Sequence, residues 1–247
     1  MNITDRWLLR MTCPGRTGLM PAEFSNRFSS IGERSEMDWK FVDRSVPHWT
    51  LILVSKFDHC LNDLLHRKQT GELNIDVTTM ASNHPALRAI ACFHQVPFKV
   101  LSANRSKTFT KAKQEGRIRK LIEGRGIDLV ILARYTQVLS NELCQNFVGL
   151  YINIHHLFSP SSKGARPHHK AYKRGVKAIG ATAHCVRSDL DEGPIIDQEV
   201  ARVDHTCELG QLLATGRNVE TYVLYWAVKA YSEHRLFLNE HKTAVLK

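Results

Sequence analysis

Strand-length apolar runs alternate with helical segments from residue 49 onward, and this rhythm limits the fold more than any other feature. The strand-like runs are 49–56, 73–82, 97–103, 126–135, 149–156, 178–186 and 194–203. Helical patterns fall at 59–68, 85–94, 110–124, 140–147 and about 208–234, and a small hairpin follows at 236–246. Strands that alternate with helices build a mostly parallel sheet covered on both faces. The sequence therefore predicts an α/β fold with a doubly wound, mostly parallel sheet.

Length and composition fit one α/β domain with a small appendage. The chain has 247 residues, 43% of them hydrophobic and 23% charged. No apolar run approaches the roughly 18 residues that span a bilayer, and the first residues lack the apolar core of a secretory signal. We therefore expect a cytoplasmic protein with no membrane partner. The mitochondrial matrix stays open because Arg6, Arg10 and Arg16 lie close together.

Cysteine spacing and net charge narrow the class further. The six cysteines occur singly without any C-x-x-C, so neither a zinc knuckle nor a disulfide framework is predicted. The formal charge of +10 suggests an anionic partner. The basic residues are spread and not interleaved with aromatic ones, which favours a small polyanion or a merely basic surface over nucleic acid.

The segment 151–172 gathers four histidines directly after an apolar strand. Doubly wound sheets bind ligands at the carboxyl ends of central strands, and those ends here are "LARYTQ" (132–137) and "NIHH" (153–156). Adjacent histidines on an extended chain point to opposite faces, so each pair offers one metal ligand at best. No histidine pair with i,i+4 spacing is present in this segment. We expect no metal site here.

Acid–base chemistry fits the same segment better. Asn153 and His155 are two apart on a strand, so both side chains leave one face. An amide donor beside an imidazole can stabilise a developing oxyanion. Asp191, in a tight acidic turn before a later strand, can orient His155 or deprotonate a water. The alternative is that Asn153 and His155 only hydrogen-bond the backbone at a strand end, and spacing alone leaves both readings open.

Several long motifs resemble one family. "ASNHP", "DLVILARY", "NIHH", "KGARPHHKAY", "GATAH", "DLDEGPI" and "GRNVE" occur in the order typical of formyltetrahydrofolate deformylases, folate-dependent hydrolases of the formyltransferase superfamily. The resemblance runs from about residue 35 to the end of the chain. It implies a Rossmann-like formyltransferase catalytic domain at 46–247, preceded by a partial ACT-like α+β segment at 1–45. Residues 21–43 resemble the last helix and strand of an ACT domain, and the middle of that domain is missing.

The resemblance also implies a reaction and a set of residues. The expected reaction is hydrolysis of 10-formyltetrahydrofolate to formate and tetrahydrofolate, which supplies one-carbon units for purine biosynthesis. Asn153 and His155 would stabilise the oxyanion, and Asp191 would activate the water. The expected substrate-binding residues are His184, Leu132, Ala133, Arg134, Tyr135, Gln137, Leu139 and Gly164. No metal or other cofactor is implied, because the folate is the substrate, and the partners expected are this small molecule and further copies of the chain.

Two alternatives remain at this stage. The first is a formyltransferase that acts on a small amine such as glycinamide ribonucleotide. Related purine transferases hold phosphate on a glycine-rich turn, whereas the matching turn here, "SKFDHCLND" (55–63), has no glycine and two acidic residues. The second is a catalytically impaired folate-binding relative, because Leu157, Ser159, Ser162 and Thr136 replace residues typical of the family.

Overall fold

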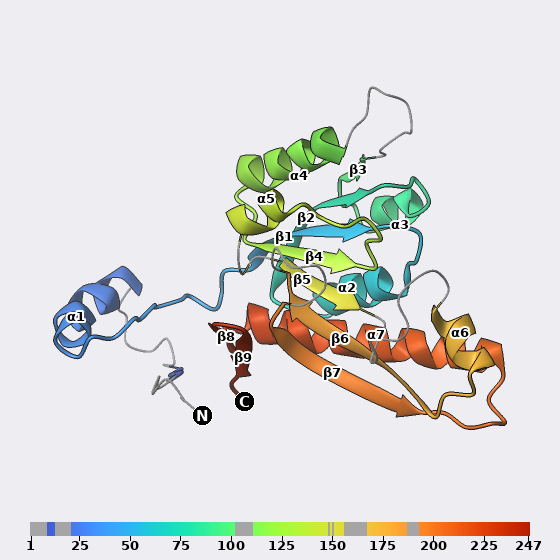
Figure 1. Cartoon of the computed structure of the whole chain (residues 1–247). Coiled ribbons are helices and arrows are strands. Elements are labelled where there is room, and N and C mark those ends of the chain that lie inside the picture. Colours follow the sequence, from blue (N-terminus) through green and yellow to red (C-terminus); the bar gives the residue numbers. More distant parts are fainter. Residues whose placement is uncertain are drawn as a thin grey trace. The chain divides into compact units, whose positions relative to one another are not determined.

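The computed structural model describes residues 9–12, 21–101, 111–147, 149, 151–155, 167–186 and 193–247. It divides the chain into two compact units, Met1–Pro47 and His48–Lys247 (Figure 1).

The larger unit is built on a seven-stranded sheet with the order β3-β2-β1-β4-β5-β6-β7. The strands are β1 (His48–Val54), β2 (Ile75–Ser82), β3 (Phe98–Val100), β4 (Leu129–Ala133), β5 (Tyr151–His155), β6 (Ala178–Cys185) and β7 (Ile195–Arg202). The pairs from β3 to β5 are parallel, and β6 and β7 are antiparallel to their neighbours. The predicted α/β fold with a doubly wound, mostly parallel sheet is confirmed.

Helices cover both faces of this sheet (Figure 1). One face packs against α2 (His59–Gln69), α3 (Arg88–Phe93) and α7 (Leu209–Ser232), and the other packs against α4 (Lys111–Arg125) and α5 (Asn141–Asn146). The unit also contains α6 (Pro167–Lys173) and a hairpin of β8 (Leu236–Asn239) and β9 (Lys242–Val245). None of the described helices is long and apolar enough to cross a membrane.

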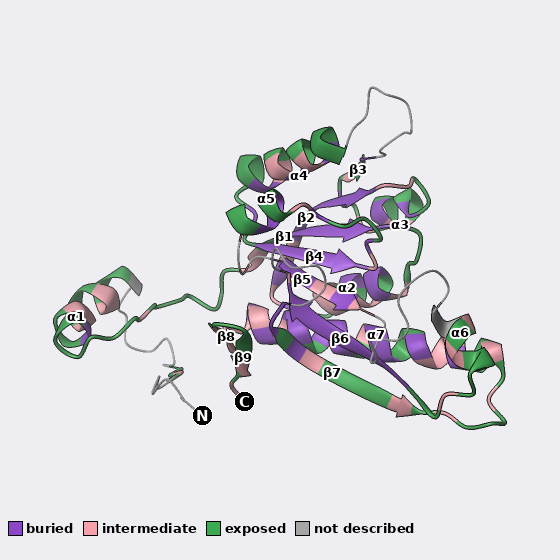
Figure 2. Cartoon of the chain, in the orientation of Figure 1, coloured by how far each residue is buried: buried purple, intermediate pink, exposed green. Residues whose placement is uncertain are grey.

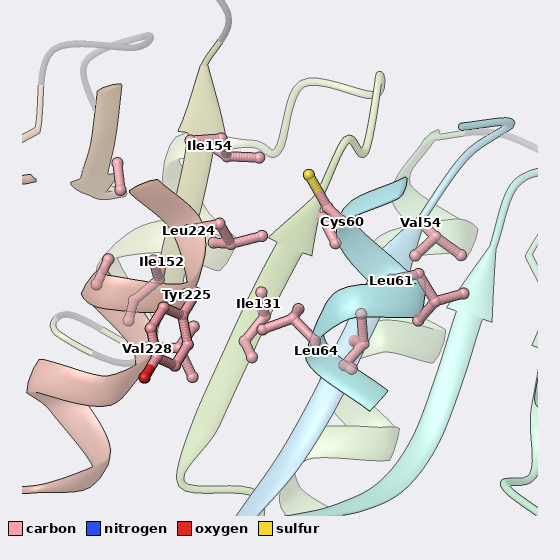
Figure 3. Packing of buried hydrophobic residues seen from close by; sticks show 14 of the residues in the cluster. Val54, Cys60, Leu61, Leu64, Ile131, Ile152, Ile154, Leu224, Tyr225 and Val228 are labelled. Atoms are coloured by element: carbon pink, nitrogen blue, oxygen red, sulfur yellow. The ribbon is translucent and has the colours of Figure 1, made fainter. Parts of the chain in front are cut away.

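The strands in the middle of the sheet are largely buried (Figure 2). All five residues of β4 are buried, as its unbroken apolar sequence predicts for a central parallel strand. Figure 3 shows Ile131 of β4 and Ile152 of β5 facing Leu64 of α2 and Val228 of α7. These four side chains belong to one hydrophobic cluster, so the two helices and the two central strands are held by the same apolar contacts.

Strand order reverses between β1 and β4, and this reversal places the candidate site. From β1 the chain winds through α2 to β2 on one side, and β4, on the other side of β1, is entered after α4, which lies on the opposite face. The connections therefore diverge at the carboxyl ends of β1 and β4, and such a divergence leaves the crevice where doubly wound folds bind ligands.

The smaller unit contains one described helix, α1 (Pro21–Arg34). The aromatic rings of Phe28, Trp39 and Phe41 pack against one another, with centroids 5.3–5.7 Å apart. The predicted helix is present, but the strand expected after it is not: residues 37–43 carry no strand pairing in the described part of the chain. Their aromatic side chains pack on α1 instead. The ACT-like character of residues 1–45 stays a prediction.

We expect Ile131→Ala to lower the free energy of unfolding by about 2–5 kcal/mol, because Ile131 is fully buried between helices and sheet and truncation leaves a cavity. Ile195→Ala is the matched control, since Ile195 is 48% exposed on β7 and should cost roughly 0.5 kcal/mol or less. Urea denaturation of both variants measures the difference. Equal losses would contradict the assignment of β4 to the core.

Candidate active site

The end of β5 presents the two residues that sequence spacing pairs. Asn153 and His155 are both partly exposed, whereas Ile152 and Ile154 are buried in the cluster under α7. The pleat thus sends the amide and the imidazole out on one face and anchors the strand through the other. The prediction that Asn153 and His155 share a face is confirmed.

His184 lies beside Asn153 on the neighbouring strand. The two residues are register partners in the β5–β6 ladder, and Asn153 Nδ2 is 3.2 Å from His184 Nε2. His184 Nδ1 is 3.3 Å from the carbonyl oxygen of Cys185, and an oxygen acceptor there requires a proton on Nδ1. His184 Nε2 then accepts a hydrogen bond from the Asn153 amide. Since His184 is only 3% exposed, this bond fixes the amide in one orientation.

At Gly193 the chain returns to the end of β6, beside His184. A Cβ atom at position 193 would lie 1.6 Å from the carbonyl oxygen of Cys185 and 3.4 Å from His184 Nδ1. Cys185 N–H also donates to the Pro194 carbonyl at 2.9 Å. Only glycine fits such a close approach of backbone to backbone. The start of β7 therefore packs directly against β6, the strand that carries His184.

The predicted folate-binding segment after β4 is mostly buried. Leu132, Ala133, Tyr135 and Leu139 are 0–9% exposed, so their side chains belong to the core. Among the predicted residues in 132–139, Gln137 is exposed and Arg134 is partly exposed. Burial leaves those four residues little surface for contact, so a ligand at this edge would meet Gln137 and Arg134.

Tyr135 anchors the segment on the α4 side of the sheet. Gln114 Nε2 donates to its hydroxyl at 3.2 Å and to the Leu101 carbonyl at 2.6 Å. Burial, with a smaller contribution from the negative charge of Glu115, raises the pKa of Tyr135 well above its ordinary value. The phenol therefore stays neutral and serves as a structural acceptor, not as an acid or base.

Thr136 and Ser55 join the ends of β4 and β1. The Thr136 N–H donates to Ser55 Oγ at 3.0 Å, and the two hydroxyl oxygens are also 3.0 Å apart. Ser55 Oγ in turn donates to Asn83 Oδ1 at 2.7 Å, beyond β2. The sequence analysis identifies Thr136 only as a replacement of a residue typical of the family, and it does not single out Ser55 or Asn83. The structure gives the threonine hydroxyl a polar role at the carboxyl ends of β1 and β4.

A buried carboxylate lies at the same reversal point. Glu220 of α7 is 1% exposed, and its Oε2 lies 2.7 Å from His59 Nε2 and 3.2 Å from Arg134 Nε. The guanidinium of Arg134 also lies over the ring of Phe57, 5.3 Å from its centroid. Arg134 has a φ of +62°, a conformation that costs a non-glycine residue about 1–3 kcal/mol.

The donor set of His59, Cys60 and Glu220 has the composition of a metal site, with ligand atoms within 4.8 Å of one another. An internal ion pair is favoured instead, because Arg134 already supplies a positive charge to the carboxylate oxygen that a metal would need. Burial, and next the charge of Glu220, raise the pKa of Cys60. The expectation that the protein holds no metal stays a prediction.

Some predicted residues lie outside the described part of the chain. These are Asp191, Gly164 and the altered loop at 157–162. The described residues bring together Asn153, His155 and His184, with Leu132 in register beside Asn153 on β4. Glu220 was missed as a cluster residue, although it ends the quoted motif "GRNVE". A charged residue among the apolar positions of a buried helix was the available signal.

Comparison with known proteins places this geometry in a family. The family model for formyl transferases matches residues 49–228. A formyltetrahydrofolate deformylase of Corynebacterium sp. is 46% identical over 222 residues, which are 90% of this chain and 77% of that protein. A deformylase of Bacillus subtilis is 40% identical over 218 residues, 88% of this chain and 72% of the relative.

Solved structures show the same relationship as the sequence relatives. A formyltetrahydrofolate deformylase from Burkholderia mallei superposes with a TM-score of 0.87 at 48% identity, covering 94% of this chain and 81% of its own. Glycinamide ribonucleotide transformylase 1 from Symbiobacterium toebii shares the fold alone, with a TM-score of 0.75 at 22% identity, over 86% of this chain and 100% of its own. The chain belongs to the formyl transferase family and, within it, to the formyltetrahydrofolate deformylases.

We expect Gly193→Ala to lower the melting temperature and to cost roughly 1–3 kcal/mol, because the added methyl meets the backbone that carries His184. Gly116→Ala is the control: nothing lies within 4 Å of a Cβ there, and alanine in the middle of α4 should stabilise by about 0.5–1 kcal/mol. Thermal unfolding of both variants tests this. A Gly193→Ala protein as stable as the parent would contradict the seating of β7 on β6.

Proposed function

We propose that this protein hydrolyses 10-formyltetrahydrofolate to formate and tetrahydrofolate. The observation that carries the proposal is the Asn153–His184 pair beside His155 at the carboxyl edge of the sheet, in a chain that belongs to the deformylases. An oriented amide next to an imidazole is the arrangement that attack on a formyl carbon requires.

The reaction forms a C–O and an N–H bond and breaks a C–N and an O–H bond. The water oxygen bonds to the formyl carbon, and the carbonyl becomes an oxyanion. When the carbonyl reforms, the bond between carbon and N10 breaks. Formate carries away the water oxygen, and N10 receives a proton. Because attack builds negative charge on one oxygen, fixed donors at that position lower the barrier.

Asn153 is proposed as a principal oxyanion donor. Its amide has two N–H groups. One is donated to His184 Nε2, which holds the group in place. We assign the other to the formyl oxygen. His155, on the same face of β5, is proposed as the second donor, and its partly exposed ring is accessible to substrate.

Asp191 is proposed as the base that takes the water proton and later returns it to N10. Its support is its position in the sequence, two residues before Gly193, which is the residue seated against His184. A carboxylate within reach of a water next to the electrophile suits general-base catalysis. The proton moves between water, carboxylate and leaving nitrogen, so the reaction as written requires no metal or redox cofactor, and we propose that none is used.

The folate itself is proposed to lie along residues 132–139. Support comes from the position of this segment at the carboxyl end of β4 and from the exposed Gln137 and Val138. His184 and Gly164 complete the proposed set. Residues 55–59 favour water over a ribonucleotide amine as acceptor, because His59 there is bonded to Glu220 and the turn has no glycine.

A homo-oligomer in the cytoplasm is also proposed. An exposed aromatic pair on α7, Tyr222 and Trp226, has ring centroids 6.1 Å apart and supports a contact between copies, since aromatic residues are enriched in interfaces. None of the five described cysteines forms a disulfide, which fits a reducing compartment. Sedimentation of the full chain tests the oligomer, and a monomer at micromolar concentration would contradict it.

The purified protein should release formate from 10-formyltetrahydrofolate at a rate that neither EDTA nor added glycinamide ribonucleotide changes. Asn153→Ala should lower kcat by about 10²–10³-fold, because one oxyanion donor is lost. Asp191→Asn should lower it at least as far, because the base is removed while the shape is kept. Tetrahydrofolate formation that depends on the amine, with the formyl group found on that amine, would favour the transferase.

Glu199→Gln serves as the control for these variants, since Glu199 is exposed on β7. Its kcat should equal that of the parent. Tetrahydrofolate binding by calorimetry separates the remaining alternative: a protein that binds the product but releases no formate would be the impaired folate-binding relative, and the proposed function would be rejected.

A further inference from the structure

The ion-pair cluster of His59, Arg134 and Glu220 joins three parts of the chain that are far apart in sequence. His59 begins α2, Arg134 follows the last residue of β4, and Glu220 lies in α7. His59 and Glu220 are 161 positions apart, yet their side chains meet at 2.7 Å. The cluster lies where the strand order reverses, beside the segment that we propose binds folate.

Packing alone does not account for a carboxylate at position 220. Its neighbours Val219, Val223 and Leu224 are apolar and buried in the main cluster. Removing a carboxylate from water is unfavourable unless its partners are well placed, and apolar replacements of buried ion pairs are often as stable or more stable. A carboxylate at position 220 therefore indicates a role in setting the geometry of the surrounding backbone.

Arg134 is the part of the cluster that connects to the proposed site. Its positive φ turns the chain out of β4, and its N–H donates to the Leu132 carbonyl at 3.1 Å. Its side chain reaches Glu220 on the α7 side, while the next residue, Tyr135, is held by Gln114 on the α4 side. Adjacent residues are thus fixed to opposite faces of the sheet.

Thr136 adds a third attachment through its N–H, which donates to Ser55 Oγ at 3.0 Å. Ser55 belongs to the turn between β1 and α2, and His59 is the first residue of α2. Three consecutive residues of the proposed folate segment, 134–136, are therefore held to this turn, to α4 and to α7. A small movement of Arg134 would displace the main chain that follows it.

We propose that Glu220 is a positioning residue for folate binding, which acts by holding Arg134 in its left-handed conformation and so sets the path of residues 135–139. The inference rests on the proposed function, since it assigns those residues to the folate. Glu220 itself does not touch the substrate in this account.

The test is a double-mutant cycle of Glu220→Gln and Arg134→Gly. Glutamine keeps the shape of Glu220 and removes its charge. Glycine adopts a positive φ without strain, so it no longer needs the carboxylate. Glu220→Gln alone should raise KM for 10-formyltetrahydrofolate about tenfold while kcat changes by less than about twofold, because binding geometry and not chemistry is disturbed. In the Arg134→Gly background the same change should alter KM by less than about twofold.

Glu233→Gln is the matched control. It is the same substitution directly after α7, and Glu233 also pairs with arginine, at 2.7 Å from Arg235. Its KM should not change. If Glu220→Gln does not fold, as judged by circular dichroism, Glu220→Asp replaces it in the cycle, with an expected rise in KM of about threefold because the shortened carboxylate retreats from Arg134.

The outcomes of the double-mutant cycle show whether Glu220 acts through Arg134. An equal rise in KM in both backgrounds would mean that Glu220 acts independently of Arg134 and would overturn the proposal, as would an unchanged KM or a fall in kcat alone. If the parent protein releases no formate, the proposed function fails separately. The same four proteins are then compared by their Kd for tetrahydrofolate, and the cycle is read in that constant with the same expected fold-changes.

Discussion

The parallel pairing of β1 with β4 is the constraint on which the site depends. It brings the buried carboxyl ends of the two strands to one edge, while the connections from them leave on opposite faces. Polar side chains that would be unfavourable in the core lie at this edge, where the backbone leaves the two strands. Ser55, Thr136 and Arg134 are all first or near-first residues after their strands.

The edge combines two kinds of polar arrangement. On β5 and β6, the bond between Asn153 and His184 orients an amide but leaves the neighbouring face partly open, as a reactive site requires. Between α2, β4 and α7, the carboxylate of Glu220 is enclosed by His59 and Arg134. The first arrangement is suited to act on a ligand. The second is suited to keep the surrounding backbone in place, since reacting groups must be held to about 0.5 Å.

Local features of the sequence predicted much of this. The unbroken apolar run at β4 identified a central strand, and the two-residue spacing of Asn153 and His155 predicted their common face, because strand periodicity is independent of distant contacts. The pairing of His59 with Glu220 was not predictable in this way, since it depends on how α2 and α7 pack on the finished sheet. The burial of Leu132 and Leu139 likewise follows from helices that cover β4. The strand expected after α1 is absent from the described residues, because Trp39 and Phe41 pack on apolar side chains of the helix instead of pairing with another strand.

The proposed reaction makes water the acceptor of the formyl group at this edge of the sheet. A single turnover of 10-formyltetrahydrofolate in H₂¹⁸O, followed by mass spectrometry of the products, tests this role of water. We expect formate that carries one ¹⁸O atom, in amounts equal to the tetrahydrofolate formed. Tetrahydrofolate without labelled formate, or a formyl group found on an added amine, would contradict it.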